Sequence, residues 1–172
     1  MMSRYKLHEF NKLAERSIFI DANVIIYLFW PTGQHNFEMS YAKVFKNFLV
    51  QKNKLFVDIF IISEIINRIL RIEHQKISST QNFKDFRNSE VGKNALNDIH
   101  IILKDNILKV IDIASKGYSQ KEIESFFNIE DIDFVDKATT LLCKENDMVL
   151  LTNDGDFKNS AIEIISGNPK LV

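Results

Sequence analysis

Short apolar runs alternate along the chain with segments whose apolar residues recur at helical spacing. Runs of β-favouring residues with the length of strands occur at 17–21, 55–60, 108–113, 148–152 and 162–165. The segments with helical spacing, which predict helices, are 41–50, 61–72, 95–103 and 123–127. Strands that alternate with helices form right-handed βαβ units. The pattern therefore predicts a Rossmann-like, three-layer α/β/α fold around a central, mostly parallel, five-stranded sheet.

Two further segments complete this outline. Residues 1–16 precede the first predicted strand as an extension, and Leu7, Phe10 and Leu13 predict a short helix in it. Residues 78–90, SSTQNFKDFRNSE, are polar enough to predict a mobile excursion between two helices.

Composition narrows the setting. The 172 residues include two Pro and five Gly and show no linker or repeat, so we expect a single domain over residues 1–172. Lys and Arg number 22 against 23 acidic residues, which gives no basic footprint of the kind typical of nonspecific nucleic-acid binders. The single cysteine, Cys143, excludes an intramolecular disulfide and a multi-cysteine zinc site. Because no uncharged apolar stretch approaches the roughly 18 residues of a membrane span, we expect a cytoplasmic protein without membrane contact.

Acidic residues occupy four places where a predicted strand ends or a predicted helix begins. Asp21 closes the first strand in IFIDANVIIYL, and Glu64 lies early in the helix ISEIINRIL. Asp136 lies at the start of a helix in IEDIDFVDKATTLL, and VLLTNDGDF places Asp154 and Asp156 after the fourth strand. The carboxyl ends of parallel strands meet at one edge of the sheet, where ligands bind in open α/β folds. These acids are therefore candidate site residues.

Each acid also has a purely structural interpretation. Asp21 suits the N-cap of a helix, and Glu64 suits a first turn, where the helix dipole favours a negative charge. Asp133 and Asp136 have the three-residue spacing of a capping box, and Asp154 suits a turn. Taken singly, the residues leave both interpretations open.

In this order and spacing, the four motifs resemble those of the PIN-domain nucleases. The family has an Asp at the end of strand one, matched by FIDANVII with Asp21, and a Glu early in the helix after strand two, matched by ISEII with Glu64. A third acid opens the helix before the fourth strand, matched by FVDKATTLLCKEND with Asp136. A Thr-any-Asp sequence ends that strand, matched by LLTNDGDF with Asp154. The interval of 18 residues between the last two acids accommodates one helix and one strand, and it favours Asp136 over Asp133.

The resemblance implies a metal-dependent ribonuclease with a PIN-like fold. The residues it assigns to catalysis and metal binding are Asp21, Glu64, Asp136 and Asp154, with Asp156 as an outer metal ligand. Asn23 and Thr152 would orient these ligands by hydrogen bonds. Clustered carboxylates stay ionised together only if cations neutralise them, and carboxylate ligands suit Mg²⁺ or Mn²⁺ rather than zinc. In the family such ions activate water for attack on a phosphodiester bond of RNA.

The resemblance also implies partners besides RNA. An antitoxin protein would bind the chain if it is the toxin of a type II toxin–antitoxin pair. Toxin-type members begin almost directly with strand one, whereas sixteen residues precede that strand here. Arg68 and Arg71, on the helix of Glu64, would contact substrate phosphates or form surface salt bridges. The aromatic residues of segment 29–41 would pack in the core, or they would form the surface of a homodimer or of another protein complex.

Three other classes fit the same sequence less well. A noncatalytic PIN-like module that binds protein or RNA would be expected to lack some of the four acids. An Asp-nucleophile phosphatase needs a second Asp two residues after the first, where this chain has Asn23. A phosphoacceptor receiver needs an Asp at the end of its third strand and a later Lys, for which only Asp112 is a candidate.

Overall fold

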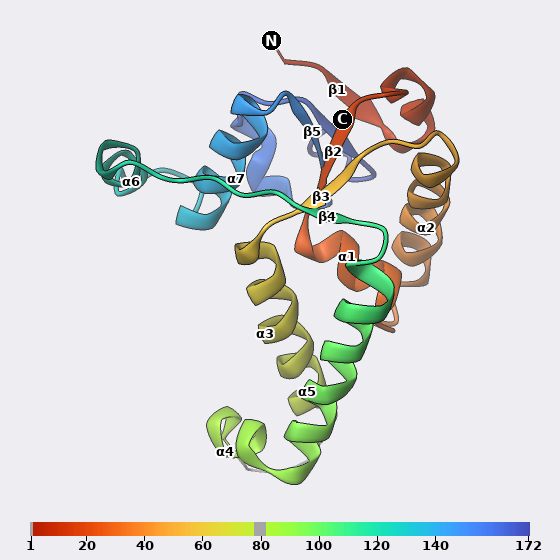
Figure 1. Ribbon diagram of the computed structural model, residues 1–172, viewed down its shortest axis with the longest axis vertical. Helices are drawn as coiled ribbons and strands as arrows, with labels where there is room; N and C mark the ends of the chain where they lie inside the picture. The colour runs from red at the N-terminus through yellow and green to blue at the C-terminus, as the bar shows by residue number, and fades with distance from the viewer. Residues whose placement is uncertain (1, 78–81) are drawn as a thin grey trace.

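The computed structural model describes residues 2–77 and 82–172 and has a central sheet flanked by helices (Figure 1). The described residues form six parallel strands in the order β1-β6-β5-β2-β3-β4. The strands are β1 Arg4–Lys6, β2 Ser17–Ile20, β3 Leu55–Val57, β4 Asp112–Ile113, β5 Met148–Leu151 and β6 Ile164–Ser166. The predicted α/β fold is confirmed. Two details are corrected, because the sheet has six strands rather than five and all of its pairings are parallel.

The additional strand comes from the N-terminal extension. Strand β1 pairs along β6, with Arg4 opposite Ile164, and the Arg4 guanidinium donates to the carbonyl oxygen of Ser160 at 2.7 Å. An Arg-Tyr-Lys segment has no apolar run, so hydrophobic periodicity gives no signal for it. The short helix expected in this extension is present as a 3₁₀ helix, η1 Leu7–Leu13.

Several helices begin earlier than the apolar spacing predicts, and side chains cap the starts of α3, α5 and α6. Asp58 is an example: its carboxylate accepts from the backbone N–H of Ile61 at 2.9 Å, which begins α3 inside the predicted second strand. The helices are α1 Ala22–Phe29, α2 His35–Val50, α3 Ile59–Lys76, α4 Phe83–Asn88, α5 Glu90–Ile102, α6 Gln120–Phe126 and α7 Phe134–Glu145, with a π-helical turn η2 Leu103–Ile107 and a 3₁₀ helix η3 Gly155–Asn159.

The polar segment 78–90 was predicted as an excursion between helices, and its described part is mostly helical. Residues 78–81 lie outside the described residues, whereas α4 follows directly and is capped by Asn82, whose side chain accepts from the N–H of Asp85 at 3.0 Å. A close approach joins α4 to α5, since a Cβ added to Gly92 would lie 2.1 Å from the carbonyl oxygen of Phe86. Figure 1 shows α3 and α5 extending away from the sheet, with α4 at the far end.

The run at 108–113, predicted as a strand, pairs only over its last residues. Asp112 and Ile113 form β4 at the edge of the sheet beside β3. Before them, Ile107 and Ile111 are buried in the core from η2 and the turn that follows it. Within the run itself, Ile111 is buried, whereas Leu108, Val110 and Ile113 are exposed.

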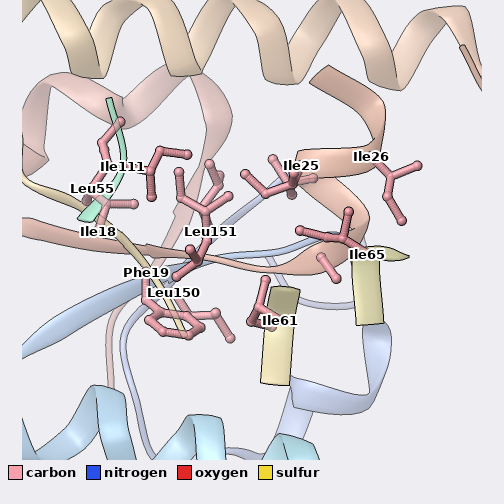
Figure 2. Close-up of a cluster of buried hydrophobic side chains, with 14 of the residues drawn as sticks. Ile18, Phe19, Ile25, Ile26, Leu55, Ile61, Ile65, Ile111, Leu150 and Leu151 are labelled. Atoms are coloured by element: carbon pink, nitrogen blue, oxygen red, sulfur yellow. The ribbon is translucent and has the colours of Figure 1, made fainter. Parts of the chain in front are cut away.

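The core surrounds strands β2 and β5, whose residues are almost all buried (Figure 2). Such continuous apolar runs are expected of parallel strands that are covered on both faces. Helix α7 packs on β5, and α1 packs against both α2 and α3. Of the helices in the described residues, none combines the length and the apolar character that crossing a membrane requires.

The sheet order places the ends of β2 and β5 side by side. The chain runs from β2 to β3 and β4 on one side, and later enters β5 and β6 on the other side. The last residues of the two strands, Ile20 and Leu151, are paired. A reversal of strand order of this kind leaves a crevice at the carboxyl ends of the strands. Asp21 and Thr152, the residues that follow, lie at this crevice.

Candidate active site

Asp21 joins the end of β2 to the start of α1. One carboxylate oxygen accepts from the backbone N–H of Ala22 at 2.7 Å, so Asp21 is an N-cap. The other oxygen accepts from the side-chain amide of Asn23 at 2.7 Å and from the hydroxyl of Thr152 at 2.5 Å. The residue is only 6% exposed. These bonds hold the carboxylate in one orientation.

Thr152 and Asn23 form a buried support behind Asp21. The Thr152 hydroxyl, besides donating to Asp21, accepts from the backbone N–H of Asp154 at 2.9 Å. The side-chain oxygen of Asn23 accepts from the N–H of Asn153 at 3.2 Å. These contacts connect the ends of β2 and β5, as expected for residues that orient neighbouring carboxylates.

Aromatic packing supports the same turn from behind. The hydroxyl of Tyr41, a fully buried residue of α2, donates to the carbonyl oxygen of Thr152 at 3.0 Å. Elsewhere in segment 29–41, the Trp30 indole donates to Glu73 at 2.9 Å, and Phe37 stacks on Tyr27. Trp30 and Tyr41 therefore make internal contacts, whereas Phe37 is 38% exposed.

Asp154 and Asp156 lie in the turn after β5. Asp154 accepts from the N–H of Asp156 at 3.0 Å and thereby begins η3. Asp154 is partly buried, whereas Asp156 is exposed. Asp154 thus caps a turn, as its sequence context predicts. Its carboxylate also lies at the carboxyl edge of the sheet.

The two acids at the start of α7 have different roles. Asp133 is the N-cap, since its carboxylate accepts from the backbone N–H of Asp136 at 2.8 Å. A reciprocal bond from the Asp136 carboxylate to the N-cap backbone, which would complete a capping box, does not occur among the described residues. The Asp136 side chain instead faces the other acids.

Glu64 approaches the edge from α3 and is paired with Arg68 at 2.9 Å. Arg68 therefore forms a salt bridge, which was one of the two interpretations of this residue from sequence. Its partner is an acid of the site. The guanidinium of Arg71 lies 4.5 Å from the centre of the Phe83 ring. Arg71 thus stacks at α4, and neither arginine lines the pocket of the acids.

The predicted acids line one pocket with a volume of about 400 Å³. Its acidic lining residues are Asp21, Glu64, Asp133, Asp136, Asp154 and Asp156. Phe60, Ser63 and Asn67 of α3 also line it, and the sequence analysis assigned no role to them. Phe60 lies four residues before Glu64, Ser63 is adjacent to it, and Asn67 lies three residues after it. This helical spacing from Glu64 would have been enough to predict them as pocket residues.

The pocket raises the proton affinity of its two most affected acids. Burial raises the pKa of Asp21 to about 6, and the charges of Glu64 and Asp154 add to the effect. Burial and, after it, the charges of neighbouring acids raise the pKa of Asp136 to about 8. These neighbouring acids are Asp133, Asp21, Asp154 and Glu64. Of the acids that line this pocket, only Glu64 forms an ion pair with another described residue, Arg68.

The donor set fits a hard divalent cation. Carboxylate oxygens alone suit Mg²⁺ or Mn²⁺, and the residues that could hold such an ion are Asp21, Glu64, Asp136 and Asp154. Within residues 2–77 and 82–172, no three acidic, His or Cys side chains already surround one point as metal ligands would. Binding an ion would require small side-chain rotations, including release of Glu64 from Arg68.

Comparisons with known proteins agree with this geometry. The sequence model of the PIN domain matches residues 18–163, a range that contains all four motifs. The crystal structure of FitAcB from Neisseria gonorrhoeae has a similar fold, with a TM-score of 0.52 and 14% sequence identity over 86% of this chain and 96% of that chain. No curated protein matches the chain. Because the domain match covers most of its length and every motif of the acidic pocket, the chain belongs to the PIN-domain family.

Proposed function

We propose that this PIN-domain protein is a Mg²⁺- or Mn²⁺-dependent ribonuclease. The single observation that carries the proposal is the convergence of acids from β2, α3, α7 and the turn after β5 on one pocket. Structural caps do not need to converge, because each cap satisfies only the backbone of its own helix or turn. An excess of negative charge in a pocket is costly unless a cation binds there.

The chain's own groups would position the reaction. A bound divalent ion supplies a water nucleophile at neutral pH and stabilises negative charge on the leaving oxygen. Thr152 and Asn23 hold the Asp21 carboxylate in a fixed orientation toward the pocket. Without metal the pKa of Asp136 is raised to about 8, and a bound cation would favour its ionised form, which can ligate the ion. None of the described histidines lines the pocket, so proton transfer falls to the carboxylates.

A noncatalytic RNA- or protein-binding module is the second candidate. The ion pair between Glu64 and Arg68 favours it, because this pair keeps one acid engaged without a metal. The pair is weak evidence, since both side chains are about one third to one half exposed, and such surface pairs contribute roughly 0–1 kcal/mol. A divalent ion in the pocket would compete effectively with it.

The test is RNA hydrolysis by the purified protein. We expect single-stranded RNA to be cleaved with Mn²⁺ or Mg²⁺ and to remain intact with EDTA. Asp21→Asn and Asp154→Asn should abolish cleavage, whereas Asp98→Asn, which removes an exposed acid outside this pocket, should retain it. Cleavage that persists in EDTA would exclude the metal mechanism, and a parent protein that binds RNA without cleaving it would favour the second candidate.

We also propose that a small protein partner of antitoxin type controls the activity. Family membership supports this proposal, since toxin–antitoxin pairing is typical of many PIN-domain proteins. Expression of the chain alone should arrest growth of the host cell, and Asp21→Asn should relieve the arrest. Equally fast growth of cells that express the parent and cells that express Asp21→Asn would contradict a toxin role.

A further inference from the structure

A second hollow adjoins the pocket of the acids. Its volume is about 790 Å³, and it lies between α7, the segment that joins α6 to α7, and the end of η3. Asp156 lines both hollows, so the second one begins where the candidate active site ends. Pockets of roughly 300–1,000 Å³ are typical of sites for small organic ligands.

One face of α7 forms a wall of this second hollow. Lys137, Thr140, Leu141 and Lys144 line it at intervals of three, four and seven residues, which places them on one side of the helix. Asp136, one residue before this face begins, lines the pocket of the acids. Helix α7 therefore lines both hollows, and a ligand that reaches from Asp136 to Lys144 would run along most of its length.

The polar groups of this wall differ in how far they are engaged. The Lys137 ammonium donates to the carbonyl oxygen of Phe126 at 3.2 Å and pairs with Glu130 at 3.2 Å. Lys144 is exposed and forms no ion pair with any residue that the structure describes. The Thr140 hydroxyl is buried and has no hydrogen-bond partner among those residues. Buried polar groups normally have a partner. The wall thus retains one exposed cation, Lys144, for an outside ligand.

The remaining walls combine apolar, amide and acidic side chains. Phe126, Ile132 and Ala161 supply the apolar part, and Asn128 and Asn159 supply amide donors and acceptors. The acids of these walls are Glu130, which pairs with Lys137, Asp131 and Asp156. A nucleoside matches the apolar and amide parts, since its base has flat apolar faces and a hydrogen-bonding edge. A phosphate attached to it would find its counter-charge at Lys144.

We propose that this second hollow binds the nucleotide next to the phosphate that is cleaved, with its base against the apolar walls and its outer phosphate at Lys144. The inference rests on the proposed ribonuclease function, and it adds a site for substrate binding that the acids do not provide. It predicts that binding of RNA and binding of Mn²⁺ can be weakened separately.

Three variants test the proposal. Ala161→Trp fills the hollow from an exposed position, and Lys144→Ala removes the unpaired cation. Lys104→Ala is the matched control, because it removes another exposed lysine that does not line the hollow. The probe is a short fluorescein-labelled single-stranded RNA, whose anisotropy is measured over a range of salt concentrations with Ca²⁺ present. Melting temperatures with and without Mn²⁺ report whether each variant is folded and whether its metal site is intact.

We expect Ala161→Trp and Lys144→Ala to weaken RNA binding by about tenfold while their Mn²⁺-induced shifts in melting temperature equal that of the parent. Lys144→Ala should also reduce the slope of log affinity against log salt by about one, which loss of packing alone does not do. If the parent cleaves RNA and both variants bind it as the parent does, the second hollow is not a substrate site, although the ribonuclease function stands. If the parent neither binds nor cleaves RNA, the proposed function and this inference both fail.

Discussion

Replacing Asp136 by Asn should stabilise the protein when no metal is present. The pKa of Asp136 is raised from 3.8 to about 8, so its ionised form at pH 7 is disfavoured in the folded state. One pKa unit corresponds to 1.36 kcal/mol, which gives an upper limit of about 4 kcal/mol at pH 7. Because Asp136 is partly exposed, solvent screening reduces this cost to about 1–2 kcal/mol.

An opposing contribution comes from the helix. A carboxylate in the first turn of α7 interacts favourably with the helix dipole by about 0.3–1 kcal/mol, and Asp136→Asn loses this interaction. The net expectation is a gain of about 1 kcal/mol, or roughly 2–4 °C in melting temperature for a protein of this size.

Thermal unfolding in EDTA and in saturating Mn²⁺ checks this expectation. In EDTA the variant should melt above the parent, and Asp131→Asn should change the free energy of unfolding by no more than about 0.5 kcal/mol. With Mn²⁺ at 100 times its Kd, the parent should gain about 2.7 kcal/mol and the variant clearly less. If Asp136→Asn is less stable than the parent in EDTA, and Mn²⁺ shifts both melting temperatures equally, Asp136 only stabilises the first turn of α7. That result would refute a metal-binding cluster that includes Asp136.

Three further outcomes follow from the same contacts. Without metal, the free energy of unfolding should fall as pH rises from about 4 to about 8, because Asp21 and Asp136 bind protons more tightly in the folded protein than in the unfolded chain. The melting temperature measured in EDTA over this pH range tests this expectation. A melting temperature that rises over the same range would contradict the raised pKa values. Thr152→Val should cost about 1–3 kcal/mol, since it removes one of the three donors to the buried Asp21 carboxylate, whereas Thr152→Ser should retain most stability in denaturant titrations. Tyr41→Phe should cost about 1–2 kcal/mol because it removes the hydroxyl that binds the turn after β5, and an unchanged unfolding midpoint would show that this hydroxyl does not stabilise the turn.

The parts of the fold that are predictable from sequence are those in which local pattern and burial agree. Strands β2 and β5 are continuous apolar runs that stop at an acid or a turn cluster. Both the strands and the positions of their carboxyl ends can therefore be predicted from sequence. Strand β1 cannot be predicted from sequence, because its pairing with β6 joins residues about 160 positions apart and its three residues have no apolar pattern. Caps such as Asp58 likewise move helix starts away from the first apolar residue.

The candidate site shows the same division. The order of the acids along the chain is enough to predict that Asp21, Glu64, Asp136 and Asp154 share one pocket. The 18-residue interval before Asp154 favours Asp136 over Asp133, but it does not show that the N-cap Asp133 lines the same pocket. Spacing also could not place Arg71, whose spacing from Glu64 suggested the site, because contact with the Phe83 ring depends on how α4 folds back on α3.

The most direct test of the metal-dependent site is diffraction from crystals grown with Mn²⁺, with data collected at the manganese absorption edge. The account predicts an anomalous peak in the acidic pocket within coordination distance, about 2.0–2.6 Å, of carboxylate oxygens from Asp21, Asp136 or Asp154. The same crystals of Asp21→Asn should show a weaker peak or none. A well-ordered parent structure at saturating Mn²⁺ with no peak among these acids would contradict the central claim.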